Sequence, residues 1–137
     1  MPILEILHVD DNREDLELTA MAFEQADPEV GYVGKNDSAA GLAYLERLAG
    51  ERALPPPHLF IFDINMPGMT GIELLERVKA HPKLRAIPVV ILTTSNQPAD
   101  RARTLAVGAA RYVIKPSRFD DLVAIARELL DSLGDAP

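Results

Sequence analysis

Acidic, hydroxyl and ammonium side chains stand at the ends of the short apolar runs of this sequence. Asp10 and Asp11 follow the first run, and Asp63 follows a later run that is apolar throughout. Thr93 and Lys115 stand where two further runs end. Because ligands bind beyond the carboxyl ends of the strands in an open α/β sheet, we expect these five side chains to meet at one edge.

Three neighbouring carboxylates are stable only if a cation shares their space. Two like charges about 4 Å apart repel by about 4 kcal/mol at an effective dielectric constant of about 20. Lys115 supplies one positive charge, which leaves the group negative. Oxygen ligands of this kind are typical of a Mg²⁺ site, which attracts a phosphate that arrives with the metal opposite a lysine. The three histidines lack the spacing of metal ligands and are interpreted as structural.

Asp63 is the candidate nucleophile, because a carboxylate can form an acyl phosphate. The loop that follows it, residues 64–71, contains two glycines, which allow backbone atoms to face the site. Considered alone, Asp11 would be explained as a helix cap and Lys115 as a solvated surface charge. Polar residues at four of the five strand ends make such separate explanations weaker than a shared site.

Short apolar runs alternate with amphipathic runs along the whole chain. We expect strands over residues 3–9, 30–33, 58–62, 89–92 and 111–114. Between and after them, apolar residues recur with helical spacing, most regularly over residues 122–133. The fourth helix, residues 98–107, offers Ala102, Leu105 and Ala106 as its apolar face and is expected to be the most weakly packed.

Strands that are apolar on both faces, such as residues 59–62 and 89–92, are typical of a parallel sheet covered by helices on each side. Five successive strand–helix units predict a doubly wound α/β fold with a five-stranded parallel sheet. The expected strand order is the flavodoxin-like 2-1-3-4-5. We expect residues 1–137 to form a single domain without an output domain, with the prolines at 55–57 as a stiff connector.

The composition excludes several classes of protein. With 47% hydrophobic and 26% charged residues the chain is not globally disordered, and the absence of cysteine excludes disulfides and thiolate sites. A net charge of −7 argues against direct nucleic-acid binding. Because no segment has the length of a membrane span or the basic start of a signal peptide, we expect a soluble, cytoplasmic protein without membrane contact.

Four motifs occur in the order in which one known family carries them. Over essentially its whole length, the sequence resembles the receiver domain of two-component response regulators. The motifs are Asp10-Asp11, Asp63-Ile64-Asn65-Met66-Pro67-Gly68-Met69-Thr70-Gly71, Leu92-Thr93-Thr94-Ser95 and Tyr112-Val113-Ile114-Lys115-Pro116.

The resemblance implies a phosphoryl switch at Asp63. This aspartate would take a phosphoryl group from the phosphohistidine of a sensor histidine kinase and become 4-aspartylphosphate. Asp10 and Asp11, together with Asp63 and the backbone carbonyl of Asn65, would hold the Mg²⁺ cofactor. The protein would be a stoichiometric phosphoacceptor that catalyses its own phosphorylation and dephosphorylation rather than an enzyme, and it would act on a downstream protein that the sequence does not identify.

Three further residues take roles by the same resemblance. Thr93 would bond a phosphoryl oxygen, Lys115 would pair with the phosphoryl group, and Tyr112 would be a switch aromatic that moves inward when Thr93 moves. The bond between Lys115 and Pro116 is similar to one that is usually cis in this family. The alternative for Tyr112 is a plain role in the core.

A narrower similarity links the chain to the small regulators paired with bacterial phytochrome kinases. It rests on the connector at residues 53–57, on the motifs at 63–67 and 92–95, and on the lack of an output domain. Those regulators often dimerise. The similarity therefore adds a bacterial phytochrome as the candidate kinase and a homodimer as the candidate assembly.

Other functions stay open on the residues alone. A small phosphohydrolase with an aspartate nucleophile would carry a second acid two residues on, where this chain has Asn65. A flavin mononucleotide carrier would need hydroxyl and glycine donors at residues 10–14, where this chain is acidic. The full set of Asp10, Asp11, Asp63, Thr93 and Lys115 argues against a receiver that binds partners without phosphate. The residues do not separate a signal carrier from a phosphate sink.

Overall fold

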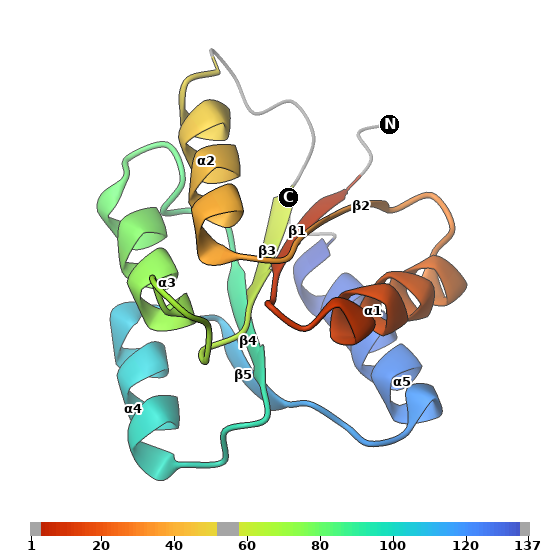
Figure 1. The fold of residues 1–137 in the computed structure, drawn as a ribbon. Helices are drawn as coiled ribbons and strands as arrows, with labels where there is room; N and C mark the ends of the chain where they lie inside the picture. Colours follow the sequence, from red (N-terminus) through yellow and green to blue (C-terminus); the bar gives the residue numbers. More distant parts are fainter. Residues whose placement is uncertain (1–3, 52–57, 135–137) are drawn as a thin grey trace.

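Strands and helices alternate through the part of the chain that the structure describes. The computed structural model describes residues 4–51 and 58–134 (Figure 1). The strands are β1 (Glu5–Val9), β2 (Gly31–Lys35), β3 (His58–Phe62), β4 (Val89–Thr93) and β5 (Arg111–Ile114). The helices are α1 (Arg13–Ala26), α2 (Ser38–Ala49), α3 (Gly71–Ala80), α4 (Pro98–Val107) and α5 (Phe119–Leu129), which continues into a π-helical turn (Leu130–Gly134). The expected alternation is confirmed, whereas the expected proline connector at residues 55–57 lies outside the described residues.

The five strands form one parallel sheet in the order β2-β1-β3-β4-β5, which confirms the expected doubly wound arrangement. Val9 of β1 lies opposite Phe62 of β3 in the register. The backbone N–H of Asp63 donates to the Val9 carbonyl at 3.1 Å. Asp10 and Asp63 therefore leave neighbouring strands at the same level.

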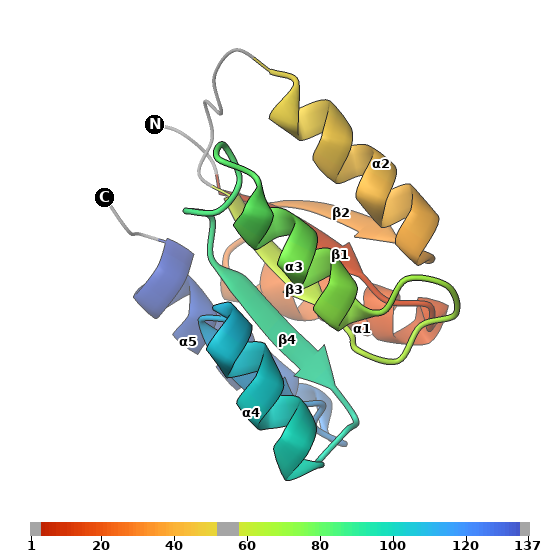
Figure 2. The same cartoon turned by 90° about the vertical axis from the view of Figure 1, so that its left-hand side faces the viewer.

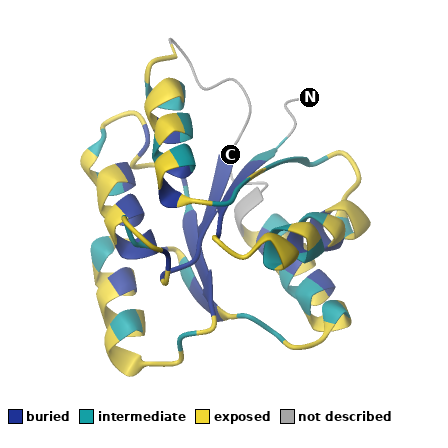
Figure 3. Cartoon of the chain, viewed as in Figure 1, coloured by how far each residue is buried: buried dark blue, intermediate teal, exposed yellow. Residues whose placement is uncertain are grey.

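Helices cover both faces of this sheet. α1 and α5 lie on one face, and α2, α3 and α4 lie on the other (Figure 1 and Figure 2). Every residue of β3 and β4 is buried, and Figure 3 shows the centre of the sheet as the buried part of the molecule. Phe60 and Phe62 share a core with residues of α2 and α3, whereas Leu59 and Ile61 share one with α1 and α5. No helix within residues 4–51 and 58–134 has the length and apolar character to cross a membrane.

Side-chain caps set the starts of the helices that follow β1 and β3. The Asn12 side chain accepts from the backbone N–H of Asp15 at 3.1 Å, so Asn12 caps α1 and the cap interpretation of Asp11 is wrong. Asp11 stands one residue too early to reach the free N–H groups of the first turn. Thr70 and Glu73 form a capping box at the start of α3. The two caps end the loops that carry the acidic residues.

α4 turns a different side toward the sheet from the one expected. Ala102, Leu105 and Ala106 are exposed, and Thr104 is the buried residue of the helix. The Thr104 hydroxyl donates to carbonyls of the preceding turn at 2.9 and 3.1 Å, so it is satisfied within the helix and its burial costs little. The predicted face was wrong even at Leu105, which is 40% exposed, because the packing of α4 against α3 and β5 decides which side is buried. α4 buries one residue where α3 buries five, which makes its packing weak by comparison.

Candidate functional site

The aspartates that follow β1 and β3 meet at the carboxyl edge of the sheet. One carboxylate oxygen each from Asp10, Asp11 and Asp63 lie within 4.8 Å of one another, and we call these three residues the acidic cluster. Asp10 and Asp63 are 0% and 5% exposed, whereas Asp11 is exposed to solvent. The cluster therefore has buried oxygens on one side and an open approach on the other.

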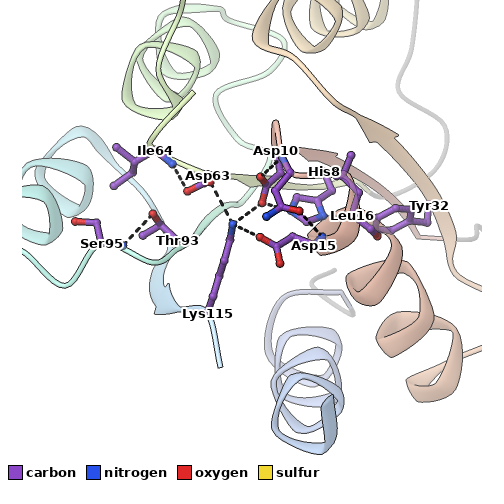
Figure 4. Close-up of polar contacts among 11 residues, drawn as sticks. His8, Asp10, Asp15, Leu16, Tyr32, Asp63, Ile64, Thr93, Ser95 and Lys115 are labelled. Carbon is purple, nitrogen blue, oxygen red and sulfur yellow. Dashed lines mark hydrogen bonds and ion pairs between the residues drawn. The ribbon is translucent and has the colours of Figure 1, made fainter. Parts of the chain in front are cut away.

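Lys115, which follows β5, brings a positive charge to this edge. Its Nζ lies 2.7 Å from Asp10, 2.7 Å from Asp15 and 3.2 Å from Asp63 (Figure 4). Burial alone lowers the pKa of Lys115, but hydrogen bonds to Asp10 and Asp15 and the charges of Asp10 and Asp63 outweigh it and raise the pKa above its ordinary value. Lys115 is therefore an ammonium ion at neutral pH.

Asp15 is a site residue that the sequence did not reveal. It lies in the first turn of α1, and its Oδ2 accepts from Lys115 across 100 positions of the chain. Acidic residues are common in the first turn of a helix because they interact favourably with the helix dipole, so this position does not by itself mark a long-range contact. The one sequence feature that could have indicated a place near the site is the spacing of four residues between Asp11 and Asp15, about one helical turn.

Opposing influences set the protonation of Asp10. Burial raises its pKa, while the hydrogen bonds from Lys115 and from the Asn12 backbone N–H, at 2.9 Å, lower it. The negative charge of Asp63 raises it further, and the result is a pKa of about 6. Asp10 is thus a carboxylate at neutral pH that binds a proton in mildly acidic solution.

A buried histidine stands behind Asp10. The His8 Nδ1 lies 2.5 Å from the Tyr32 hydroxyl, which donates to the Leu16 carbonyl at 3.1 Å, and His8 Nε2 lies 3.8 Å from Asp10 Oδ2 (Figure 4). Burial, and then the charge of Lys115, lower the pKa of His8 to about 3. His8 is therefore neutral and adds no positive charge to the acidic cluster.

Asp63 is held by its own backbone and by the start of α3. Its Oδ1 accepts from the Ile64 N–H at 2.8 Å, and its Oδ2 accepts from Lys115 at 3.2 Å. The Gly71 N–H donates to the Ile64 carbonyl at 3.1 Å, and a Cβ added at Gly71 would lie 1.9 Å from the Asp63 carbonyl oxygen. The close approach of α3 requires glycine and fixes the backbone that carries the carboxylate.

Thr93 and Tyr112 are joined through the loop that follows β4. Thr93 is fully buried, and its Oγ1 accepts from the Ser95 N–H at 3.3 Å. The Tyr112 hydroxyl donates to the Ser95 carbonyl at 2.7 Å, and the residue is 8% exposed. Tyr112 thus points into the molecule and contacts the same loop as Thr93, which is compatible with both the switch and the core interpretation.

The loop after Asp63 is fastened by a serine that the sequence did not single out. The Ser38 hydroxyl, at the start of α2, donates to the Pro67 carbonyl and accepts from the Met69 N–H, each at 3.2 Å. Asn65 lies on the same loop and is exposed.

None of the described peptide bonds is cis, so the bond between Lys115 and Pro116 is trans. The expectation of a cis bond at this position was wrong. For a bond that precedes proline, trans is the lower-energy form by about 0.5–1 kcal/mol.

The acidic cluster fits a hard divalent cation. Its donor atoms are carboxylate oxygens from three residues, which Mg²⁺ prefers over nitrogen or sulfur. One lysine opposes these three aspartates and Asp15, so the site as a whole is strongly negative at neutral pH. An arrangement of this kind binds a cation and, with it, an anionic group that Lys115 can also contact.

Comparison with known proteins identifies the family. The family model described as "Response regulator receiver domain" matches residues 6–127. A probable methanogenesis regulatory protein, FilR2, from Methanothrix harundinacea is 36% identical over 129 residues, which cover 90% of this chain and 79% of that protein.

Solved structures give the same result. The phosphorylated cyanobacterial phytochrome response regulator RcpA superposes with a TM-score of 0.82 at 29% identity, over 96% of this chain and 94% of that one. The Mn²⁺-bound form of response regulator Rcp1 superposes with a TM-score of 0.80 at 26% identity, over 97% and 96% of the two chains. The expected resemblance to receivers, and to the phytochrome regulators among them, is confirmed. This chain belongs to the family of response regulator receiver domains of two-component systems.

Proposed function

We propose that this chain accepts a phosphoryl group from a sensor histidine kinase on Asp63, in a Mg²⁺-dependent reaction, and thereby changes a partner-binding surface. The observation that carries the proposal is the place of the Asp63 carboxylate. It is buried at the end of β3, belongs to the acidic cluster and has Oδ2 3.2 Å from the Lys115 ammonium group. A carboxylate between a cation site and an ammonium group is suited to attack the phosphorus of an anionic donor.

In the proposed reaction an oxygen of Asp63 attacks the phosphorus of the phosphohistidine. A P–O bond to the aspartate forms while the P–N bond breaks, and the histidine leaves as neutral imidazole with a proton taken from water. Lys115 is near enough to neutralise an oxygen of the transferred group, and Thr93 is the hydroxyl proposed to bond another. Hydrolysis of the acyl phosphate by water restores the carboxylate and releases inorganic phosphate.

Asp10, Asp11 and Asp63 are the residues that would hold Mg²⁺, with the backbone carbonyl of Asn65 as a further proposed ligand. Mg²⁺ bound there supplies charge neutralisation for the phosphoryl oxygens. The chain itself orients the carboxylates, since Asp10 and Asp63 each accept a backbone N–H, at 2.9 and 2.8 Å. The Mn²⁺-bound form of the similar regulator Rcp1 supports a divalent cation in such a domain.

The proposed switch runs from Thr93 to α4. Phosphorylation would draw Thr93 toward the phosphoryl group, and Tyr112 and the start of α4 would follow. Support comes from three hydrogen bonds of Ser95. Its N–H donates to Thr93, its carbonyl accepts from Tyr112, and its hydroxyl donates to Asp100 of α4 at 2.6 Å. Because α4 is weakly packed, its surface and that of β5 and α5 are the proposed contact for a downstream protein.

The similar phytochrome regulators suggest the partners. A bacterial phytochrome is the kinase we propose, because the RcpA structure is described as a phytochrome response regulator. Residues 1–137 would act as one receiver unit, and a homodimer is the proposed assembly. The reaction would take place in the cytoplasm, where phosphohistidine donors are made from ATP.

Acetyl phosphate tests the proposal without knowledge of the kinase. Incubation of the purified protein with acetyl phosphate and Mg²⁺ is expected to add the mass of one phosphoryl group, and peptide mapping is expected to locate it on Asp63. Chelation of divalent cations with EDTA is expected to reduce the uptake to background. No gain of mass under conditions in which Mg²⁺ binds would contradict the proposal, and repeated turnover of a small phosphate ester would favour the phosphohydrolase instead.

The affinity for Mg²⁺ is expected to fall as the pH is lowered through about 6. Because burial raises the pKa of Asp10 to about 6, a proton occupies this carboxylate below that pH and the cation must displace it. The dissociation constant should rise toward about tenfold per pH unit below about pH 6 and change little above about pH 7. Calorimetric titration with MgCl₂ across this range checks the profile. An affinity that is constant from mildly acidic to mildly basic solution would show that Asp10 does not bind the cation.

A further inference from the structure

The ammonium group of Lys115 has three N–H donors, and carboxylates from three residues surround it. Two of these residues, Asp10 and Asp63, belong to the acidic cluster. The third, Asp15, does not belong to the group of residues whose oxygens lie within 4.8 Å of one another. Lys115 therefore divides its contacts between the cation site and a carboxylate beside it.

Lys115 and a divalent cation compete for the same oxygens. A cation that enters the acidic cluster needs Asp10 and Asp63, whose oxygens Lys115 contacts at 2.7 and 3.2 Å. Asp15 contacts Lys115 at 2.7 Å, as closely as Asp10 does, and it is not one of the clustered residues, so a cation bound in the cluster would not need its oxygens. We propose that Asp15 is a positioning residue: it holds the Lys115 ammonium group on the α1 side and so limits its competition with a divalent cation for the acidic cluster.

The first turn of α1 fixes Asp15 for this role. The Asn12 side chain accepts the Asp15 backbone N–H at 3.1 Å, so the residue sits on the capped, ordered turn. The side chain of Lys115 is 12% exposed and that of Asp15 is 29% exposed, so water screens their interaction only in part. An acidic residue that only interacted with the helix dipole would not have to contact Lys115.

The neighbouring residue provides a matched comparison. Glu14 lies in the same first turn and carries the same charge, but it is exposed and forms no ion pair within the described ranges. Loss of its charge changes the helix dipole interaction and the net charge as much as loss of the Asp15 charge does. A difference between the two substitutions therefore reports on the place of Asp15 beside the acidic cluster, and the Lys115→Met background separates the contact with Lys115 from a direct attraction of the cation.

Calorimetric titration of the full chain with MgCl₂ is the test. Asp15→Asn, which preserves size, is expected to raise the dissociation constant of Mg²⁺ by about fivefold, and Glu14→Gln by less than about twofold. In the Lys115→Met background, where the competitor is absent, Asp15→Asn is expected to act no more strongly than Glu14→Gln. Circular dichroism checks that each variant is folded.

Two results would overturn the proposal. Equal Mg²⁺ affinities of Asp15→Asn and Glu14→Gln would show that only the charge matters, and an undiminished effect in the Lys115→Met background would show that Asp15 does not act through the lysine. This inference rests on the proposed function. Phosphoryl uptake measured on the same samples shows which of the two fails. Wild-type protein that binds Mg²⁺ but gains no phosphoryl mass contradicts the function alone, and wild-type protein that binds no Mg²⁺ contradicts both.

Discussion

The Asp63→Asn variant is expected to take up no phosphoryl group from acetyl phosphate in the presence of Mg²⁺. The amide lacks the anionic oxygen that attacks phosphorus, and the covalent step has no other route at this position. The variant should stay folded, because asparagine has the same size and removes a charge that acts unfavourably on Asp10. Intact mass spectrometry of the treated protein checks the result.

An acidic residue away from the site provides the control. Asp121 is exposed in the first turn of α5, and Asp121→Asn is expected to take up phosphoryl groups as the wild-type protein does. Uptake by Asp63→Asn at the wild-type rate would assign the acceptor to another residue. In that case the contacts of Asp63 with Lys115 would have to be purely structural.

Gly71→Ala is expected to destabilise the fold by about 3 kcal/mol and to disturb the acidic cluster. A Cβ at this position would lie 1.9 Å from the carbonyl oxygen of Asp63, so either α3 or the backbone of the acceptor residue has to move. The same movement would shift the Asp63 carboxylate away from Lys115. The midpoint of urea unfolding measures the stability, and titration with Mg²⁺ measures the damage to the cluster.

A second glycine shows whether crowding is the cause. Gly50, at the end of α2, has a φ of −79°, and its nearest contact for an added Cβ is the Arg47 carbonyl at 3.4 Å. Gly50→Ala is expected to leave Mg²⁺ binding unchanged and to raise the stability slightly, by about 0.5 kcal/mol, through the lower entropy of the unfolded chain. Equal unfolding midpoints for the two variants would show that the space at Gly71 is not restricted.

The central part of the fold could be predicted because its signal is local. Residues 59–62 and 89–92 are continuous apolar runs, and such runs form buried parallel strands with little dependence on the rest of the chain. Once the sheet is parallel, the residues that follow the strands must share one edge. The convergence of Asp10, Asp63 and Lys115 was therefore predictable without any knowledge of distances.

Features that depend on contacts between distant segments were not predictable in this way. Asp15 meets Lys115 across 100 residues, and its position in the helix has a sufficient local explanation. The orientation of α4 was predicted wrongly: Thr104, whose hydroxyl is hydrogen-bonded within the helix, is buried, whereas Leu105 is exposed. Nor did the sequence decide the role of Tyr112, since an aromatic residue within a short strand at this position suits either a core or a switch.

The contacts that hold α4 determine how much free energy the displacement of this helix costs. It is linked to the sheet edge by the Ser95–Asp100 hydrogen bond and by the Arg101 guanidinium group, which lies 5.8 Å from the centre of the Tyr112 ring, rather than by a stripe of large buried side chains. Exchange of a hydrogen bond for water costs about 1 kcal/mol, whereas withdrawal of a large apolar side chain from a core costs about 2–5 kcal/mol. A displaced α4 would then lie about 2 kcal/mol above the ground state and be occupied by a few per cent of molecules at room temperature. The regulator would thus hold a standing minor population in the alternative arrangement before any signal arrives.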